Sequence, residues 1–421
     1  MGKMEINSNI KLKNGLKITH IKIEHLETAA FSLKGLAGSM HENTRQTGIA
    51  HFLEHLVFNG TKKFKTQEEI TGYIEDVGGF ANAYTSTDHV DYVVKLLKKD
   101  LERGFIYLSE LALQPLLRVK DINKEKNVIT QEIHRFTDSV EMYAPRKIYS
   151  LMYPDQRLGK YVTGEVPDIA NITQQAIKEF RGQRYTAQNF SLAVCSNHST
   201  DEIIKLAEKH FSGMKKGKHT ITPKTTYSKE LNIQVENRND NMQSALVISF
   251  SGYEYSNSKV FSKKVISYIL GESSLSRLYQ VLREKHGLGY VVSSYIKSGP
   301  NYGHFNIYMG LAQQNVPKAL KLIKEELLKL VEKGISETEL SRVKNLAVAG
   351  FAFEFEDSLE VASYYSHRDL FRNNIKTHYD ELEMYKNITA DNIKATAKEL
   401  FLQDPKILVV ANNLNQSAII W

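Results

Sequence analysis

The sequence predicts an α+β protein built from two homologous domains of the α/β-roll type, each an antiparallel-rich sheet packed by helices. The chain has 421 residues, which is long for one domain and natural for two. Strand-like and helix-like patterns follow one another in the same order in both halves. Residues 214–229 contain few apolar side chains, so we expect a linker between an N-terminal domain at 1–213 and a C-terminal domain at 230–421.

The first half begins with strand-like runs over 4–37, interrupted by Asn14-Gly15, a dipeptide typical of a hairpin turn. Residues 47–59 predict a helix that is apolar almost all round and therefore buried. Ser199 and Glu202 form a capping-box pattern that predicts the start of another helix. The full set of later elements is a helix at 67–79, two strands within 80–97, a strand at 190–196, and helices at 98–115, 121–138, 172–184 and 200–212.

The second half repeats this order of elements. It predicts a strand at 243–253, helices at 258–271 and 274–285, strands at 289–299 and 303–311, and a helix pair at 318–334 and 336–355. That pair matches the pair predicted within 98–138. The two halves share few identical residues, so the predicted duplication rests on the pattern of elements.

Charge and hydropathy argue against several classes of protein. The formal net charge is +7, but both signs are interspersed, and no zinc finger or stripe of Arg and aromatic residues indicates nucleic-acid binding. No run of 18 apolar residues predicts a membrane-spanning helix, and the N-terminus lacks the apolar core of a secretory signal. We therefore expect a cytoplasmic protein without nucleic-acid or membrane partners. The single cysteine, Cys195, cannot form an internal disulfide and is expected to be buried in a strand.

His51 and His55 form the most informative pattern in the chain. Four residues on a helix correspond to about 400° of rotation, so the two side chains project from one face and can hold one zinc ion. Glu54 lies on the same side, where its carboxylate can act as general base toward a water beside the metal. The order H-x-x-E-H is the signature of the inverzincin peptidases. The alternative is a buried helix with two core histidines and a capping glutamate, which would need partners for three polar groups.

A catalytic zinc site needs a third protein ligand and an open fourth position. Glu125 and Glu132 are seven residues apart in the helix predicted at 121–138, hence on one face. They offer a candidate carboxylate ligand with a second carboxylate behind it. The alternative for this pair is a solvated acidic face, which the spacing leaves open.

The segment GSMHENTRQTGIAHFLEHLVFNGTKKF resembles the metal-binding segment of the pitrilysin or insulinase family of inverzincins, in its branch with subunits of mitochondrial-processing-peptidase size. In that family the third ligand is a glutamate that follows the second histidine after 76 intervening residues, and residues 56–131 supply this spacing before Glu132. The resemblance therefore implies one zinc per chain, held by His51, His55 and Glu132. Glu125 stands where the family has a supporting glutamate, and we expect it to hydrogen-bond a ligand histidine.

Two further segments carry the resemblance into the rest of the chain. VGGFANAYTSTDHVDY is similar to the family's edge strand, so Asn82, Ala83 and Tyr84 are expected to bind an unfolded peptide through backbone hydrogen bonds. SSLSRLYQVLREKHGLGYVVSSY is similar to a segment with an Arg and a Tyr seven apart, here Arg283 and Tyr290. The resemblance implies that Tyr290 helps stabilise the oxyanion and that Arg283 holds a substrate carbonyl. The alternative is a salt bridge for the arginine and a packed position for the tyrosine.

The resemblance also implies a zinc metallopeptidase whose two-domain subunits close around a chamber that admits unfolded peptides. Because this chain carries both the zinc motif and the Arg/Tyr pair, we expect a homodimer, with a heterodimer of related subunits as the alternative. A dedicated precursor-processing peptidase and a non-catalytic scaffold subunit are the competing functions. Four other histidines, His89, His134, His286 and His304, are expected to be surface or core residues, with His134 facing away from the metal.

Overall fold

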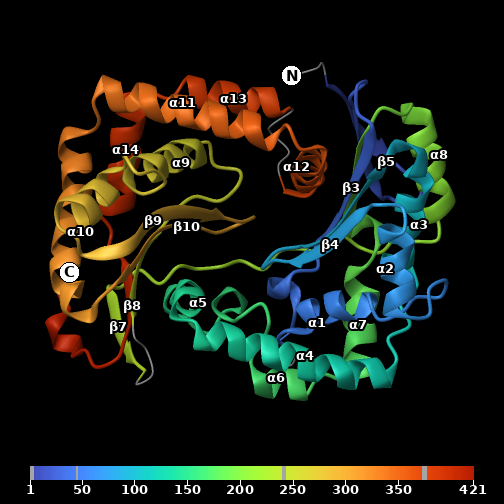
Figure 1. Cartoon of the computed structure of the whole chain (residues 1–421), viewed down its shortest axis with the longest axis horizontal. Helices are drawn as coiled ribbons and strands as arrows, with labels where there is room; N and C mark the ends of the chain where they lie inside the picture. The colour runs from blue at the N-terminus through green and yellow to red at the C-terminus, as the bar shows by residue number, and fades with distance from the viewer. Residues whose placement is uncertain (1–3, 44–45, 239–242, 372–376) are drawn as a thin grey trace. The chain divides into compact units, whose positions relative to one another are not determined.

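The computed structural model describes residues 4–43, 46–238, 243–371 and 377–421. It divides into two compact units, each built around one sheet (Figure 1). Unit 1 comprises Met1–Ile133, Lys160–Pro223 and Ala352–Ile375, and unit 2 comprises His134–Gly159, Lys224–Phe351 and Lys376–Trp421. The chain crosses from unit 1 to unit 2 after Pro223, within the predicted linker, and residues 215–229 contain neither helix nor strand.

Unit 1 contains a six-stranded sheet in the order β1-β2-β6-β3-β5-β4. Neighbouring strands pair antiparallel, except β2 and β6, which are parallel. The strands are β1 (Glu5–Lys11), β2 (Lys17–Lys22), β3 (Thr28–Gly35), β4 (Phe80–Thr85), β5 (Val90–Leu97) and β6 (Phe190–Ser196). The helices of unit 1 are α1 (Ile49–Val57), α2 (Gln67–Glu75), α3 (Leu101–Leu113), α6 (Val166–Ala170), α7 (Gln174–Arg184), α8 (Thr200–Phe211) and α12 (Ser358–Phe371).

Unit 2 contains a five-stranded sheet in the order β7-β11-β8-β10-β9. Its strands are β7 (Asn232–Asn237), β8 (Ser244–Ser251), β9 (Gly289–Ser298), β10 (Gly303–Leu311) and β11 (Lys406–Ala411). Its helices are α5 (Val140–Met152), α9 (Lys259–Leu270), α10 (Val316–Lys333), α13 (His378–Lys386) and α14 (Ala390–Phe401). Two long helices, α4 (Val119–Asp138) and α11 (Glu337–Glu354), each begin in one unit and end in the other.

The two sheets share one topology. The order β2-β6-β3-β5-β4 in unit 1 corresponds to β7-β11-β8-β10-β9 in unit 2. The parallel pair, β2 with β6 or β7 with β11, occupies the same place in both. The predicted fold class, an antiparallel-rich sheet with helices used twice, is therefore confirmed.

Each unit contains one helix from the other half of the sequence. Helix α12 lies on one face of the unit 1 sheet, against β3 and β6, and α3 and α8 lie on the opposite face (Figure 1). Helix α5 packs in the same way against β8 and β11 of unit 2. The compact units therefore extend beyond the contiguous ranges 1–213 and 230–421, because each sheet needs a cover on its second face.

One predicted element differs in kind from the structure. Residues 274–276, expected to begin a helix at 274–285, form a turn in which the Ser276 amide donates to the Ser273 carbonyl at 3.0 Å. The segment Tyr279–Lys285 is π-helical. Such wide helical turns are rare and occur often at functional sites.

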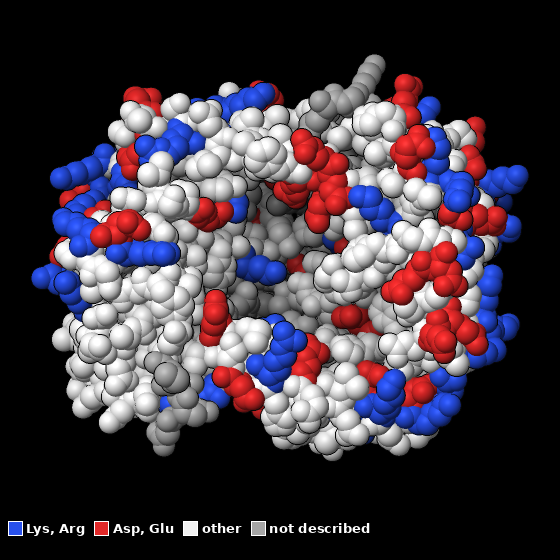
Figure 2. Space-filling view, in the orientation of Figure 1, with Lys and Arg blue, Asp and Glu red and all other residues white. Residues whose placement is uncertain are grey.

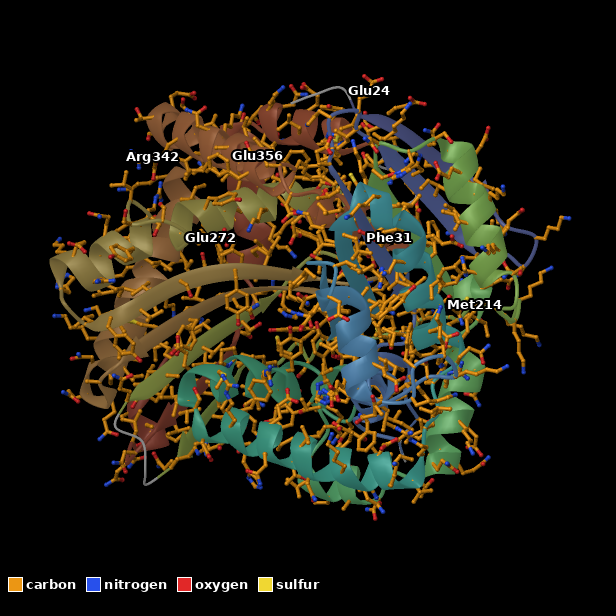
Figure 3. The ribbon with its side chains drawn as sticks, turned by 45° about the vertical axis from the view of Figure 1, so that its right-hand side comes forward. Glu24, Phe31, Met214, Glu272, Arg342 and Glu356 are labelled. Carbon is orange, nitrogen blue, oxygen red and sulfur yellow. The ribbon has the colours of Figure 1, made fainter. Side chains whose placement is uncertain are left out.

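An apolar layer fills the space between the unit 1 sheet and its helices. Phe31 of β3, labelled in Figure 3, meets Phe105 of α3 edge to face, with ring centroids 5.2 Å apart. Gly104 allows this approach, because a Cβ there would lie 2.5 Å from the Phe31 ring. The same layer includes Phe52 and Leu53, so it also fixes α1, the helix of the H-x-x-E-H motif.

The opposite face of β3 is polar. Side chains alternate across a strand, so Ser32 and Lys34 point away from the apolar layer and toward α12. Lys34 Nζ lies 3.0 Å from Asp91 Oδ2 in a buried ion pair, and Ser32 Oγ donates to Asp91 Oδ1 at 2.6 Å. Ser363 of α12 donates to Asp91 Oδ2 at 3.1 Å. The exchanged helix is thus attached to the sheet through a buried polar network.

The surface carries charges of both signs. On the face drawn in Figure 2, both Lys or Arg side chains and Asp or Glu side chains are scattered over each unit. Within the described ranges, no helix combines the length and the apolar character needed to cross a membrane.

Removing the Asp91 carboxylate is expected to destabilise the protein strongly. The change Asp91→Ala leaves the Lys34 ammonium buried and unpaired, and losing one partner of a buried pair costs about 3–5 kcal/mol. The control Glu27→Ala breaks the exposed pair with Lys98, which is worth less than about 1 kcal/mol. Urea unfolding followed by circular dichroism measures both. Equal decreases in the free energy of unfolding of the two variants would contradict a structural role for the buried network.

The protein is expected to lose stability as the pH is lowered, because two histidines are buried in unit 1. Burial lowers the pKa of His20 to about 4, and burial together with the Arg184 charge lowers the pKa of His41 to about 4. Below pH 6.5 the unfolded chain binds protons that the folded chain does not, so stability present above pH 6.5 is lost as pH falls toward 4. At pH 5.5, each histidine lowers the free energy of unfolding by on the order of 1 kcal/mol relative to neutral pH.

Urea unfolding at pH 7 and pH 5.5 measures this loss. In the variant His20→Gln the difference between the two pH values should shrink, because the substituted side chain does not titrate. An unchanged difference would show that His20 does not contribute to the acid sensitivity.

Candidate metal centre

Helix α1 begins after a left-handed glycine and is capped by a carboxylate from outside the helix. Gly48 precedes the helix with φ +83°, and a Cβ at this position would lie 2.6 Å from the Thr163 carbonyl oxygen, so glycine is required. The buried carboxylate of Glu42 accepts hydrogen bonds from the Gly48 and Ala50 amides at 3.1 and 2.9 Å. These contacts satisfy amides at the helix start and place its histidines.

His51, His55 and Glu132 converge on one point. One potential ligand atom from each lies within 4.8 Å of the others. Glu132 Oε2, from α4, is 3.6 Å from Nε2 of His51 and 3.6 Å from Nε2 of His55. The centroids of the two imidazole rings lie 4.6 Å apart. The three predicted ligands are thus brought together from two helices.

The donor set suits zinc. Two imidazole nitrogens and one carboxylate oxygen form the kind of three-ligand site that leaves a fourth position open. In a tetrahedral zinc site with metal–ligand distances of about 2.0–2.1 Å, the ligand atoms lie about 3.3 Å apart. The 3.6 Å separations are close to this value. Both histidine nitrogens therefore stand close to the distance from Glu132 that zinc requires.

Glu125 orients one of the histidines. Its Oε2 lies 3.3 Å from Nδ1 of His55, and its Oε1 accepts a hydrogen bond from Asn59 Nδ2 at 3.1 Å. With Nδ1 engaged by Glu125, Nε2 of His55 is left for a metal. Burial opposes ionisation of Glu125, but the hydrogen bonds from His55 and Asn59 outweigh burial and hold its pKa below the usual value. The carboxylate stays charged and positions the ring.

Glu54 lies beside the cluster without belonging to it. Its Oε2 accepts a hydrogen bond from Thr85 Oγ1 at 2.7 Å. Burial raises the pKa of Glu54, and the Thr85 hydrogen bond and the neighbouring His55 only partly offset that increase. A carboxylate with a raised pKa beside a metal position is suited to accept and return a proton. Thr85 also ties Glu54 to the end of strand β4.

Strand β4 forms an edge of the unit 1 sheet, since the strand order ends there. Asn82 and Tyr84 are exposed, whereas Ala83 is buried at 8% exposure. Asn82 Nδ2 donates to the Tyr84 hydroxyl at 3.0 Å. The predicted edge strand is therefore present, and its outer side can accept another strand through backbone hydrogen bonds.

Arg283 and Tyr290 lie next to each other in unit 2. Arg283 Nη1 donates to the Tyr290 carbonyl at 3.1 Å, and the Arg283 guanidinium stands 5.0 Å from the Tyr279 ring centroid. The Tyr290 hydroxyl donates to Gln243 Oε1. Tyr290 is exposed at 42% on β9, the edge strand of its sheet. The predicted salt bridge of the alternative interpretation is absent among the described residues.

The remaining histidines do not join the cluster. His134 is exposed on α4, and His286 is half-buried. His89 pairs with the neighbouring Asp88 at 2.6 Å. His304 is fully buried in unit 2, where its Nε2 contacts the Tyr149 hydroxyl at 3.0 Å. Cys195 is buried in β6, where burial raises the pKa of its thiol to about 12, so it is not a nucleophile.

Three contributors were not predicted from the sequence. Asn59 follows His55 by four residues, so helical spacing carried a signal for it. Glu42 caps α1 from outside the helix, and Thr85 reaches Glu54 only because β4 returns past α1. Neither of these two has a local pattern that marks it.

Comparisons with known proteins relate the chain to a family named for its peptidases. Residues 20–165 match the family described as Insulinase (Peptidase family M16), and residues 171–347 match the Peptidase M16 inactive domain. The three clustered residues and Glu54 all lie in the first match. An uncharacterized zinc protease of Rickettsia felis is 32% identical over 94% of this chain and 96% of its own length. The mitochondrial-processing peptidase subunit beta of Bos taurus is 26% identical over 83% of this chain and 73% of its own length.

Solved structures share the fold. A protease from Helicobacter pylori aligns with a TM-score of 0.89 at 22% identity, covering 97% of this chain and 100% of that chain. A structure from Pseudomonas fluorescens, described as a peptidase M16 inactive domain, aligns with a TM-score of 0.90 at 17% identity over 98% and 99% of the two chains.

Replacing Glu125 is expected to weaken zinc binding. The change Glu125→Ala removes the acceptor at His55 Nδ1, and loss of such an orienting contact typically costs 10–100-fold in metal affinity. The control His134→Ala alters an exposed histidine of the same helix and should bind zinc as tightly as the unaltered chain. Competition titration against a chelating dye measures both affinities. Unchanged affinity in Glu125→Ala would contradict the orienting role.

Proposed function

Because the chain belongs to the insulinase family, peptidase family M16, we propose that it is a zinc-dependent endopeptidase or oligopeptidase acting on unfolded peptides. The observation that carries the proposal is the convergence of His51, His55 and Glu132 beside the half-buried carboxylate of Glu54. A scaffold subunit would have no need of a complete donor set with a general base next to it.

The cofactor in this proposal is one zinc ion per chain. When bound, zinc polarises the substrate carbonyl and lowers the pKa of a water at its open position toward neutrality. Nε2 of His51, Nε2 of His55 and a carboxylate oxygen of Glu132 would hold it. Glu125 and Asn59 keep the His55 ring in the orientation that this requires.

Glu54 carries the proton in this mechanism. Its carboxylate accepts a proton from the attacking water and returns it to the nitrogen of the departing amine. The hydrogen bond from Thr85 Oγ1 fixes the carboxylate during both transfers. Because burial raises the pKa of Glu54, the protonated intermediate state is less costly than for an exposed glutamate.

Strand β4 positions the peptide. A substrate in extended conformation adds to this edge and pairs with the backbone of Asn82, Ala83 and Tyr84, which gives affinity with little sequence selectivity. Thr85 ends the strand and donates to Glu54, so a peptide aligned on β4 is in register with the general base. For Tyr290 and Arg283 we propose contacts with the oxyanion and with a substrate carbonyl; Tyr290 would then leave its partner Gln243.

The partner proposed for one chain is a second copy of itself. The chain carries both the zinc-ligand set and the Arg283/Tyr290 pair, so it requires no second type of subunit. A bovine relative is named as the beta subunit of a processing peptidase, which supports a heterodimer as the alternative. Light scattering after size exclusion separates these outcomes: a monomer that cleaves only after addition of a related chain would exclude the homodimer.

The change Glu54→Gln tests the proposed function. We expect the purified variant to retain zinc and to cleave unstructured peptides 10²–10⁴-fold more slowly, because the general base is lost. The control Glu24→Gln alters an exposed carboxylate, labelled in Figure 3, and should retain full activity. Zinc content by mass spectrometry and cleavage of a peptide library measure both properties. A zinc-free wild type, or equal cleavage by Glu54→Gln, would contradict the proposal.

A further inference from the structure

One surface of unit 1 is built from segments that lack carboxylates. Although the chain has 48 acidic residues, three segments contain no Asp or Glu: 6–23, 180–200 and 209–229. The parts of them that meet in unit 1, which we call the basic patch, are residues 11–15, 187–188 and 214–221. Five exposed lysines stand on the basic patch: Lys11, Lys13, Lys215, Lys216 and Lys218.

Backbone and side-chain contacts join the three segments of the basic patch. Asn14 Nδ2, in the turn between β1 and β2, donates to the Met214 carbonyl at 3.1 Å. Met214, labelled in Figure 3, is buried and anchors the stretch that follows α8. The Gln188 amide donates to the Lys216 carbonyl at 3.1 Å, and a Cβ at Gly15 would lie 3.2 Å from the Gln188 side chain. The lysines therefore project from a backbone that is fixed.

The lysines of the basic patch have no acidic partner. Among the residues that the structure describes, none of the five forms an ion pair. Other lysines of unit 1 do: Lys98 pairs with Glu27 at 2.9 Å, and Lys209 pairs with Glu102 at 2.6 Å. A group of cations that the protein does not neutralise attracts a partner with several negative charges.

An isoleucine projects from the same stretch of chain. Ile221 is 87% exposed, the highest fraction among the exposed large hydrophobic side chains of the described residues. The preceding residue, Thr220, is buried, and its amide donates to Asn189 Oδ1 at 2.7 Å. The Thr220 hydroxyl accepts a hydrogen bond from Arg184 Nη1 at 3.3 Å. The chain is therefore held in place one residue before Ile221, whose aliphatic side chain stands in solvent.

Cations beside one exposed aliphatic side chain fit an anionic lipid surface better than a soluble polyanion. Lysines are attracted by the negative potential of such a surface, and an aliphatic side chain enters the boundary between headgroups and acyl chains. Single-stranded nucleic acids stack their bases on aromatic side chains, and the exposed residues of the basic patch include no Phe, Tyr or Trp. An acidic peptide would pair with the lysines but would leave Ile221 without a role.

We propose that the basic patch docks the chain reversibly on a membrane surface rich in anionic phospholipid, with the lysines at the headgroups and Ile221 inserted among them. The patch includes the turn between β1 and β2, and the sheet order places β1 and β4 at opposite edges. Docking therefore leaves the edge of β4 free and does not depend on the proposed function. The sequence-based expectation of no membrane partner rested on the lack of a spanning run, which attachment to the surface does not require.

Co-sedimentation of the full chain with lipid vesicles tests the proposal. We expect vesicles of phosphatidylcholine with about 30% phosphatidylglycerol to bind the chain at least about 10-fold tighter than vesicles of phosphatidylcholine alone. Binding should weaken as the salt concentration is raised, because exposed charges are screened. Equal binding to both kinds of vesicle, or binding to neither, would overturn the proposal.

A triple variant tests the lysines. Combining Lys215→Gln, Lys216→Gln and Lys218→Gln should weaken binding to the anionic vesicles on the order of 100-fold, because each lysine near such a surface contributes about 5-fold. The matched control carries the same change at three exposed lysines outside the patch: Lys99, Lys120 and Lys321. The control should lose less than about 3-fold, since charges farther from the surface are screened. Equal losses in the two triple variants would show an effect of net charge alone and overturn the proposal.

The change Ile221→Ser separates a lipid surface from a soluble polyanion. It should weaken vesicle binding about 3–10-fold, because apolar area is no longer buried in the bilayer. The control Leu402→Ser alters a side chain of unit 2 that is 64% exposed, and should have no effect. Polyglutamate and single-stranded RNA are tested in parallel, and circular dichroism verifies that every variant is folded. Tight binding of either polymer, together with vesicle binding that Ile221→Ser leaves unchanged, would assign the patch to a soluble partner and overturn the proposal.

Discussion

The hydrogen bond between the His55 ring and the Glu125 carboxylate is the interaction on which the candidate centre depends. It joins α1 to α4 and leaves Nε2 of His55 on the side of Glu132. Asn59 extends the link, since its amide donates both to Glu125 and to the His55 carbonyl. Without this contact, the His55 ring would lose the partner that holds its Nε2 toward Glu132.

The apolar layer beneath the sheet gives this contact its rigidity. Phe52 and Leu53 anchor α1 in the same layer that holds α3 through Phe31 and Phe105. The second face of the sheet is organised differently, by the buried Lys34–Asp91 pair and the hydroxyl groups of α12. One face therefore resists deformation by close packing, and the other is specified by a polar network that only one helix satisfies.

Local patterns were sufficient to predict some of this arrangement. Helical spacing predicts that His51 and His55 share a face, and the residue pattern over 80–97 predicts two strands, the first of which is Phe80–Thr85. The place of that strand at the sheet edge was implied by the family resemblance. Glu132 could be chosen over Glu125 only through a family resemblance, because α1 and α4 meet by long-range packing that spacing does not encode. The positions of α5 and α12 were beyond prediction for the same reason. The strands against which they pack lie in the other half of the chain, and no local sequence pattern identifies those strands.

Every catalytic role proposed for this chain requires that His51, His55 and Glu132 bind one zinc ion as a three-ligand centre. Anomalous diffraction at the zinc edge, from crystals of the zinc-loaded protein, tests it directly. We expect one anomalous peak per chain, within about 2.0–2.2 Å of Nε2 of His51, Nε2 of His55 and a Glu132 oxygen. A peak elsewhere in the chain, or no peak in crystals of protein that retains full peptidase activity, would rule out a zinc centre at these three residues.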